Sequence, residues 1–127
     1  MTGIILVSHC KLITDGIKLM VDEMVGDCDN VKVISAGGTD DGRLGTNGVK
    51  ILEAILSLKD CTNILIFCDI GSSILSSEMA IELVDDNSIT QKVKIVDAPL
   101  VEGAFAATVQ ASVSSDIDLI VHEAQNV

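Results

Sequence analysis

The 127-residue chain contains no tryptophan or tyrosine, only two phenylalanines and a single proline. Proteins that bind single-stranded nucleic acid stack the bases on aromatic side chains, which this sequence hardly supplies. Basic residues are also scarce: 8 Lys and Arg stand against 19 Asp and Glu, giving a net charge of -11. Neutralising the phosphates of nucleic acid requires a basic stripe. We therefore exclude nucleic acid as a ligand and expect the acidic surface to attract basic protein partners.

Long hydrophobic runs are absent as well, although 48% of the residues are hydrophobic and the mean hydropathy is +0.50. No apolar stretch approaches the roughly 20 residues that a membrane span requires. The N-terminal run from Ile4 to Val7 is too short, and too poor in flanking charge, for a signal peptide. We therefore expect one domain over residues 1–127, in the cytoplasm and with no membrane partner.

The sequence lacks the motifs of common cofactor sites. It has no G-x-G-x-x-G fingerprint, no phosphate-binding G-x-x-x-x-G-K-[ST] loop and no chelating pair of cysteines or histidines. We expect neither a metal nor a cofactor on this chain, and reduced thiols for its cysteines. The four cysteines are Cys10, Cys28, Cys61 and Cys68.

Apolar runs of strand length alternate with segments of helical periodicity along the whole chain. This alternation predicts a three-layer α/β/α fold with a mainly parallel central sheet and helices on both faces. Thr46-Asn47 offers a helix cap, and the alternating lysines 92 and 94 indicate that the last strand lies near an edge. The predicted strands are residues 3–8, 31–35, 63–68 and 92–96; the predicted helices are 11–25, about 49–56, 74–84, 101–113 and 117–124.

Polar and glycine-rich clusters follow each predicted strand. They are Ser8-His9-Cys10, Gly37-Gly38-Thr39-Asp40-Asp41, Asp69-Ile70-Gly71-Ser72-Ser73 and Asp97-Ala98-Pro99. In open parallel sheets the ligand site lies at the carboxyl ends of the strands. All four clusters are therefore expected on one rim of the sheet.

His9 is the predicted catalytic residue on this rim. A neutral imidazole is a good nucleophile toward phosphorus, and its second nitrogen can donate to a carboxylate. Asp69 is the candidate carboxylate for that second nitrogen. The alternatives are a solvated strand-end histidine for His9 and a helix cap for Asp69; His122 is expected on the surface.

A transferred phosphoryl group needs hydrogen-bond donors around its oxygens. Glycine-rich turns and helix N-termini offer backbone N–H groups for this purpose. We predict phosphate contacts at Gly38, Thr39, Ser72 and Ser73. Each turn is a weak signal alone, and their joint placement with His9 supports the prediction.

Four segments together carry a resemblance to a known family: residues 3–9, 36–46, 69–73 and 97–104. They resemble the phosphotransferase subunits (DhaM) of PEP-dependent dihydroxyacetone kinases, which have the mannose-type IIA fold. The likeness runs essentially end to end. Two positions depart from the family pattern. Cys10 stands where a small hydroxyl residue is frequent, and Ser73 where alanine is common.

The resemblance implies a homodimer and a phosphoryl relay. His9 would accept the phosphoryl group from the phosphocarrier HPr and pass it to ADP on the nucleotide-binding subunit (DhaL). The ADP and its Mg would belong to that partner, and a third subunit (DhaK) would hold dihydroxyacetone. Because the sequence stops after the IIA-like region, we expect a separate HPr.

Two other functions stay open at this point. A mannose-type IIA domain for sugar uptake would use the same histidine, although such domains usually have Gly-Gly-Ser-Pro after the third strand instead of Gly71-Ser72-Ser73-Ile74. A receiver-like module would be phosphorylated on aspartate. It requires an acidic pair after the first strand, where this chain has His9.

Overall fold

A computed structural model describes residues 1–127, and all its strands belong to one parallel sheet. The strand order is β2-β1-β3-β4, with β1 and β3 in the centre. In the register of the sheet, Ile4 lies opposite Val33 on one side and Leu65 on the other. The strands are β1 (Thr2–Val7), β2 (Val31–Ser35), β3 (Asn63–Cys68) and β4 (Val93–Ile95).

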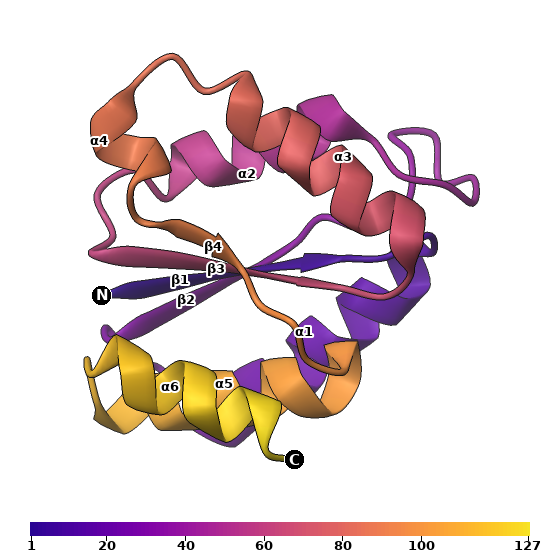
Figure 1. The fold of residues 1–127 in the computed structure, drawn as a ribbon. Helices are drawn as coiled ribbons and strands as arrows, with labels where there is room; N and C mark the ends of the chain where they lie inside the picture. The colour runs from indigo at the N-terminus through magenta and orange to yellow at the C-terminus, as the bar shows by residue number, and fades with distance from the viewer.

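Helices cover both faces of this sheet, which confirms the predicted three-layer α/β/α architecture. Figure 1 shows the sheet edge-on, with α2, α3 and α4 above it and α1, α5 and α6 below it. The upper helices are α2 (Gly48–Ser57), α3 (Gly71–Glu82) and α4 (Asn87–Thr90). The lower helices are α1 (Lys11–Val25), α5 (Leu100–Val113) and α6 (Ile117–Gln125). No helix combines the length and the apolar character needed to cross a membrane.

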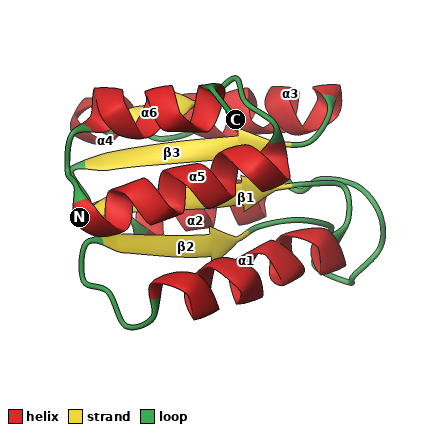
Figure 2. Cartoon of the chain, turned by 90° about the horizontal axis from the view of Figure 1, so that it is seen from below, coloured by secondary structure: helices red, strands yellow, loops and turns green.

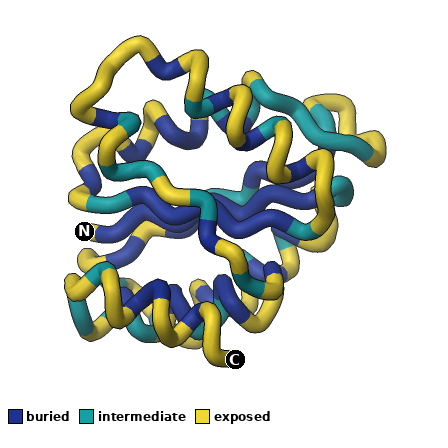
Figure 3. The backbone as a smooth tube through the Cα atoms, viewed as in Figure 1, coloured by how far each residue is buried: buried dark blue, intermediate teal, exposed yellow.

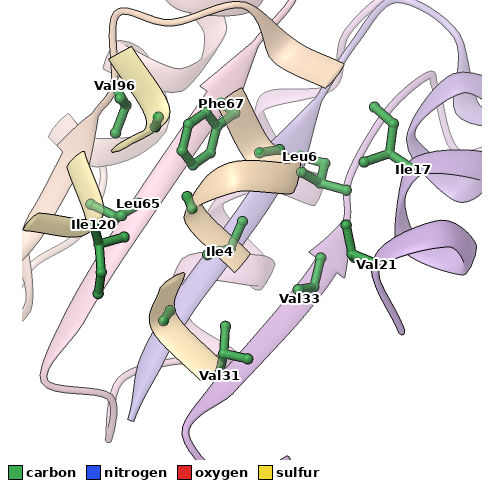
Figure 4. Packing of buried hydrophobic residues seen from close by; sticks show 14 of the residues in the cluster. Ile4, Leu6, Ile17, Val21, Val31, Val33, Leu65, Phe67, Val96 and Ile120 are labelled. Carbon is green, nitrogen blue, oxygen red and sulfur yellow. The ribbon is translucent and has the colours of Figure 1, made fainter. Parts of the chain in front are cut away.

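Two hydrophobic cores lie between the sheet and its helices. Successive strand residues point to opposite faces, so Ile4 and Leu6 pack toward α1, α5 and α6, whereas Ile5 and Val7 pack toward α2 and α3. Figure 4 shows the first core, where Phe67 lies among the same buried side chains as Ile4 and Leu6. The central strands are buried on both faces (Figure 3), which explains their uninterrupted apolar sequence.

Several predicted features of the fold are confirmed, and others differ from the prediction. Asn47 caps α2, where its side-chain oxygen accepts the N–H of Val49 at 2.9 Å, and β4 lies at an edge as predicted. Helix α3 begins at Gly71, three residues earlier than predicted, so Ser72 and Ser73 lie in its first turn instead of a preceding loop. The short α4 was not predicted, and β4 is only 3 residues long.

The sheet brings the two predicted catalytic residues together. Strands β1 and β3 run side by side in the same direction (Figure 2), and Val7 pairs with Cys68 at their carboxyl ends. Asp69 follows Cys68 directly, and His9 lies two residues after Val7. Two residues that are distant in the sequence therefore emerge next to each other on the rim.

Candidate functional site

His9 and Asp69 form a hydrogen-bonded pair at the ends of the two central strands. The backbone N–H of His9 donates to Oδ2 of Asp69 at 3.0 Å. The Nδ1 atom of the ring lies 3.1 Å from Oδ1 and 3.2 Å from Oδ2 of the same carboxylate. A carboxylate only accepts, so this contact favours the tautomer with the proton on Nδ1. The lone pair is then left on Nε2.

Nε2 points to the beginning of α3. The hydroxyl of Ser72 contacts Nε2 and is exposed to solvent. The first N–H groups of any helix have no partner within it and concentrate partial positive charge. Gly71 and Ser72 occupy these first positions in α3. The free nitrogen of His9 therefore faces a hydroxyl at the electropositive end of a helix.

Asp69 is held in its charged form. Burial alone would raise the pKa of this carboxyl group, but several hydrogen bonds outweigh burial and lower the pKa below its ordinary 3.8. The donors are the hydroxyl of Ser73 at 2.5 Å, the N–H of Ile70 at 2.7 Å, and the backbone and ring of His9. The carboxylate therefore both anchors the start of α3 and orients the ring of His9.

Ser73 lies on the other side of the ring from Ser72. Its side chain is fully buried, and its Oγ is 3.3 Å from Nδ1 of His9. The two neighbouring serines thus approach opposite nitrogens of one imidazole. This arrangement follows from the early start of α3, because adjacent helical residues point about 100° apart.

The glycine-rich loop holds the backbone around His9. The N–H of Gly38 donates to the carbonyl of Ser8 at 2.9 Å, and the N–H of Gly45 donates to the carbonyl of His9 at 2.8 Å. Gly38 has a φ of +72°, and a Cβ there would lie 3.0 Å from the backbone nitrogen of Lys11. Glycine is required because the loop passes so close to the first turn of α1.

Thr14 and Lys50 anchor the same loop from two helices. The Oγ1 atom of Thr14, which is buried, accepts the N–H of Gly37 at 3.1 Å, while Nζ of Lys50 donates to the carbonyl of Gly37 at 2.9 Å. Neither residue, nor Gly45, was predicted from the sequence to support the site. A threonine on the buried face of an amphipathic helix is the one sequence signal that could have indicated Thr14.

The structure brings some of the predicted site residues together and leaves others apart. Ser72 and Ser73 contact the ring of His9. The N–H of Gly38 is used by Ser8, and the hydroxyl of Thr39 donates to Asp41 at 2.5 Å within its own loop. The phosphate contacts predicted at Gly38, Thr39, Ser72 and Ser73 stay predictions.

A family profile matches this fold and site. The profile of EIIA-man, described as the PTS system fructose IIA component, matches residues 3–121. That range contains all four strands and both catalytic candidates. The chain belongs to the EIIA-man family. This match confirms the mannose-type IIA part of the resemblance inferred from the four segments.

The curated relatives that match this EIIA-man chain are all named as DhaM subunits of dihydroxyacetone kinases. A protein of Listeria innocua, "PEP-dependent dihydroxyacetone kinase 2, phosphoryl donor subunit DhaM", is 51% identical over 127 residues, which cover 100% of this chain and 99% of the relative. The DhaM proteins of Providencia stuartii and Escherichia coli are 43% and 38% identical. The chain spans only 26% and 27% of these two longer proteins.

Solved structures agree with the fold. A crystal structure described as "unknown function protein EF1359" has a TM-score of 0.90 and 45% identity, covering 98% of this chain and 93% of that one. An EIIA component of a phosphotransferase system from Streptococcus agalactiae has a TM-score of 0.64 and 20% identity, covering 98% and 89%. The second similarity shows the fold alone.

Proposed function

We propose that this EIIA-man chain is a phosphohistidine carrier that serves as the phosphoryl donor subunit of a PEP-dependent dihydroxyacetone kinase. The observation that supports this proposal is that the two ring nitrogens of His9 have different partners. Nδ1 is paired with the Asp69 carboxylate, and Nε2 faces the hydroxyl of Ser72 at the start of α3. One nitrogen is thus oriented by a charge and the other is available as a nucleophile.

The transfer step follows from this tautomer. The hydroxyl of Ser72, which donates to Nε2 in the free chain, releases this nitrogen. The lone pair of Nε2 then forms the new N–P bond while the bond between phosphorus and the donor atom breaks, and the donor leaves with that electron pair. The proton on Nδ1 stays in place, so no proton transfer is needed. The phosphorylated ring gains positive charge, which the ionised Asp69 carboxylate stabilises at 3.1 Å.

The oxygens of the phosphoryl group need donors on the Nε2 side of the ring. Ser72 and the first N–H groups of α3 are the nearest such groups, and we propose that they bind the phosphoryl oxygens. Gly38 and Thr39 belong to the loop that passes the same rim and remain proposed contacts. Ser73 is buried on the other side of the ring, where its Oγ lies 3.3 Å from Nδ1 of His9.

The donor and acceptor are proposed from the names of the relatives and from the resemblance. HPr would donate the phosphoryl group, and ADP on the DhaL subunit would accept it, with DhaK holding dihydroxyacetone. The 51% identity to a DhaM protein over the full chain favours this kinase over a sugar-uptake component. We further propose that the chain acts in the cytoplasm as a homodimer and carries no metal or cofactor of its own.

The test is a reconstituted relay. The chain is incubated with phosphoenolpyruvate, enzyme I and HPr, and its intact mass is measured before peptide mapping. We expect one phosphoryl group on His9 and, after addition of DhaL with ADP and DhaK with dihydroxyacetone, formation of triose phosphate. Phosphorylation without triose phosphate would reject the kinase assignment in favour of sugar uptake. Absence of phosphorylation would reject the carrier function itself.

A further inference from the structure

Ser73 contacts both members of the catalytic pair from inside the protein. Its side chain has 0% exposure, whereas its neighbour Ser72 is exposed. Its hydroxyl donates to Oδ1 of Asp69 at 2.5 Å, and its Oγ lies 3.3 Å from Nδ1 of His9. Ser73 is therefore located behind the ring, on the side opposite the reactive Nε2.

Ser73 and His9 compete for one carboxylate oxygen. Oδ1 of Asp69 accepts the hydroxyl of Ser73 and the N–H of Ile70, and lies 3.1 Å from Nδ1 of His9. Each hydrogen bond to a carboxylate stabilises its charge and lowers its affinity for a further proton. The hydroxyl of Ser73 therefore weakens the pull of Asp69 on the Nδ1 proton.

A neighbouring cysteine adds no charge to this cluster. Cys68, at the end of β3, is the buried titratable neighbour, and burial raises the pKa of its thiol, so it is neutral at physiological pH. Its Sγ lies 3.5 Å from the hydroxyl of Ser77, which in turn donates to the carbonyl of Ser73 at 2.8 Å. Within the cluster, Asp69, His9 and the hydroxyl of Ser73 contact one another directly.

We propose that Ser73 is a positioning residue that acts through Asp69 to limit how strongly the carboxylate holds Nδ1 of His9. A phosphorylated ring with its proton on Nδ1 is positively charged, so a stronger pull from Asp69 would stabilise the phosphorylated state over the free state. By weakening the interaction between Asp69 and the Nδ1 proton, Ser73 lowers the stability of the phosphorylated state and so favours transfer of the phosphoryl group to the acceptor. The effect of Ser73 on the phosphorylated state rests on the proposed carrier function. Its effect on the proton affinity of the unphosphorylated ring does not.

The chain offers a matched pair of variants. Ser73→Ala removes the hydroxyl that contacts Asp69 and His9. Ser77→Ala removes an equally buried hydroxyl one turn further along α3 that has no hydrogen bond to either residue. If the hydroxyls only stabilise the helix, the two variants behave alike.

The first readout is the protonation of the unphosphorylated ring, followed by ¹⁵N NMR over a pH titration. We expect Ser73→Ala to increase the proton affinity of His9 about three- to tenfold, which is a rise of roughly half to one pH unit in its midpoint. Ser77→Ala should leave the midpoint unchanged. In an Asp69→Asn background, Ser73→Ala should have no further effect, because the carboxylate that transmits it is gone.

The second readout is the phosphoryl equilibrium between HPr and the chain. Ser73→Ala should shift it about three- to tenfold toward the phosphorylated chain, and Ser77→Ala should not. An unchanged midpoint in Ser73→Ala, or the same shift with Asp69→Asn present, would overturn the role of Ser73. If no variant accepts a phosphoryl group, the carrier function fails, while the titration still decides the role of Ser73.

Discussion

Oδ1 of Asp69 lies 3.1 Å from Nδ1 of His9, although the two residues are 60 positions apart in the chain. The parallel pairing of Val7 with Cys68 places them there, because each follows the carboxyl end of a central strand. The pair is therefore built by the sheet, while the contacts with Ser72 and Ser73 are built by the first turn of α3.

Replacing His9 should remove phosphorylation and leave the fold intact. His9 lies on the rim with 27% of its side chain exposed and belongs to neither hydrophobic core. His9→Ala should therefore show no mass gain with phosphorylated HPr, and its circular dichroism should match that of the unmodified chain. His122→Ala is the control, since His122 is exposed on α6. Full phosphorylation of His9→Ala would remove His9 from the mechanism.

Replacing the carboxylate should slow the transfer without abolishing it. Asp69→Asn keeps the shape of the side chain but loses the charge that stabilises the phosphorylated ring. We expect the rate of phosphoryl uptake to fall roughly 100-fold, as measured by rapid quench. Asp97 lies two residues beyond the end of β4, has no hydrogen bond to His9, and is the control carboxylate. An unchanged rate in Asp69→Asn would exclude Asp69 from the mechanism.

The same carboxylate makes stability depend on pH. Its pKa is lower in the folded protein than the ordinary 3.8, so the folded state favours the ionised form. The stabilisation is complete above about pH 5 and is lost as the pH falls through 3.8 toward the folded pKa. Urea unfolding from pH 7 to pH 3 should show the stability gap between the original chain and Asp69→Asn narrowing at the acidic end. A gap that stays constant over this range would contradict the lowered pKa.

The glycine-rich loop should not tolerate a side chain at Gly37. A Cβ there would lie 2.3 Å from Oγ1 of Thr14 and 3.0 Å from the carbonyl oxygen of Cys10. Gly37→Ala should lower the free energy of unfolding by about 1–3 kcal/mol, measured by chemical denaturation. Gly16→Ala is the matched control in α1, because a Cβ at Gly16 meets nothing within 4 Å. That variant should gain roughly 0.5–1 kcal/mol. Equal effects of the two substitutions would contradict the close approach at Gly37.

The cap of α2 should contribute measurably to stability. Asn47 accepts the N–H groups of Val49 and Lys50 at 2.9 and 3.3 Å. Asn47→Ala should therefore cost about 1 kcal/mol of unfolding free energy. Thermal denaturation tests this contribution by comparing the stability loss of Asn47→Ala with that of Asn87→Ala, a control substitution in the short α4. A loss no greater than that of Asn87→Ala would mean that the cap is not what stabilises α2.

The sequence predicted most of the fold because its strands are buried on both faces and so appear as uninterrupted apolar runs. It also predicted the pairing of His9 with Asp69, since the carboxyl ends of adjacent parallel strands meet. The start of α3 was missed because Gly71-Ser72-Ser73 has the composition of a turn, while the carboxylate of Asp69 holds the backbone that begins the helix. The different orientations of Ser72 and Ser73 depend on that helical geometry, and spacing alone could not separate them.

The proposed carrier function requires that Nε2 of His9 carries the phosphoryl group while Asp69 holds the proton on Nδ1. The direct measurement is a ¹H–¹⁵N and ³¹P NMR spectrum of the chain after phosphorylation by HPr. We expect phosphorus bonded to Nε2 of His9, a protonated Nδ1, and a label that survives alkali and is lost in acid. Phosphorus on Nδ1, or an alkali-labile label on an aspartate, would contradict it.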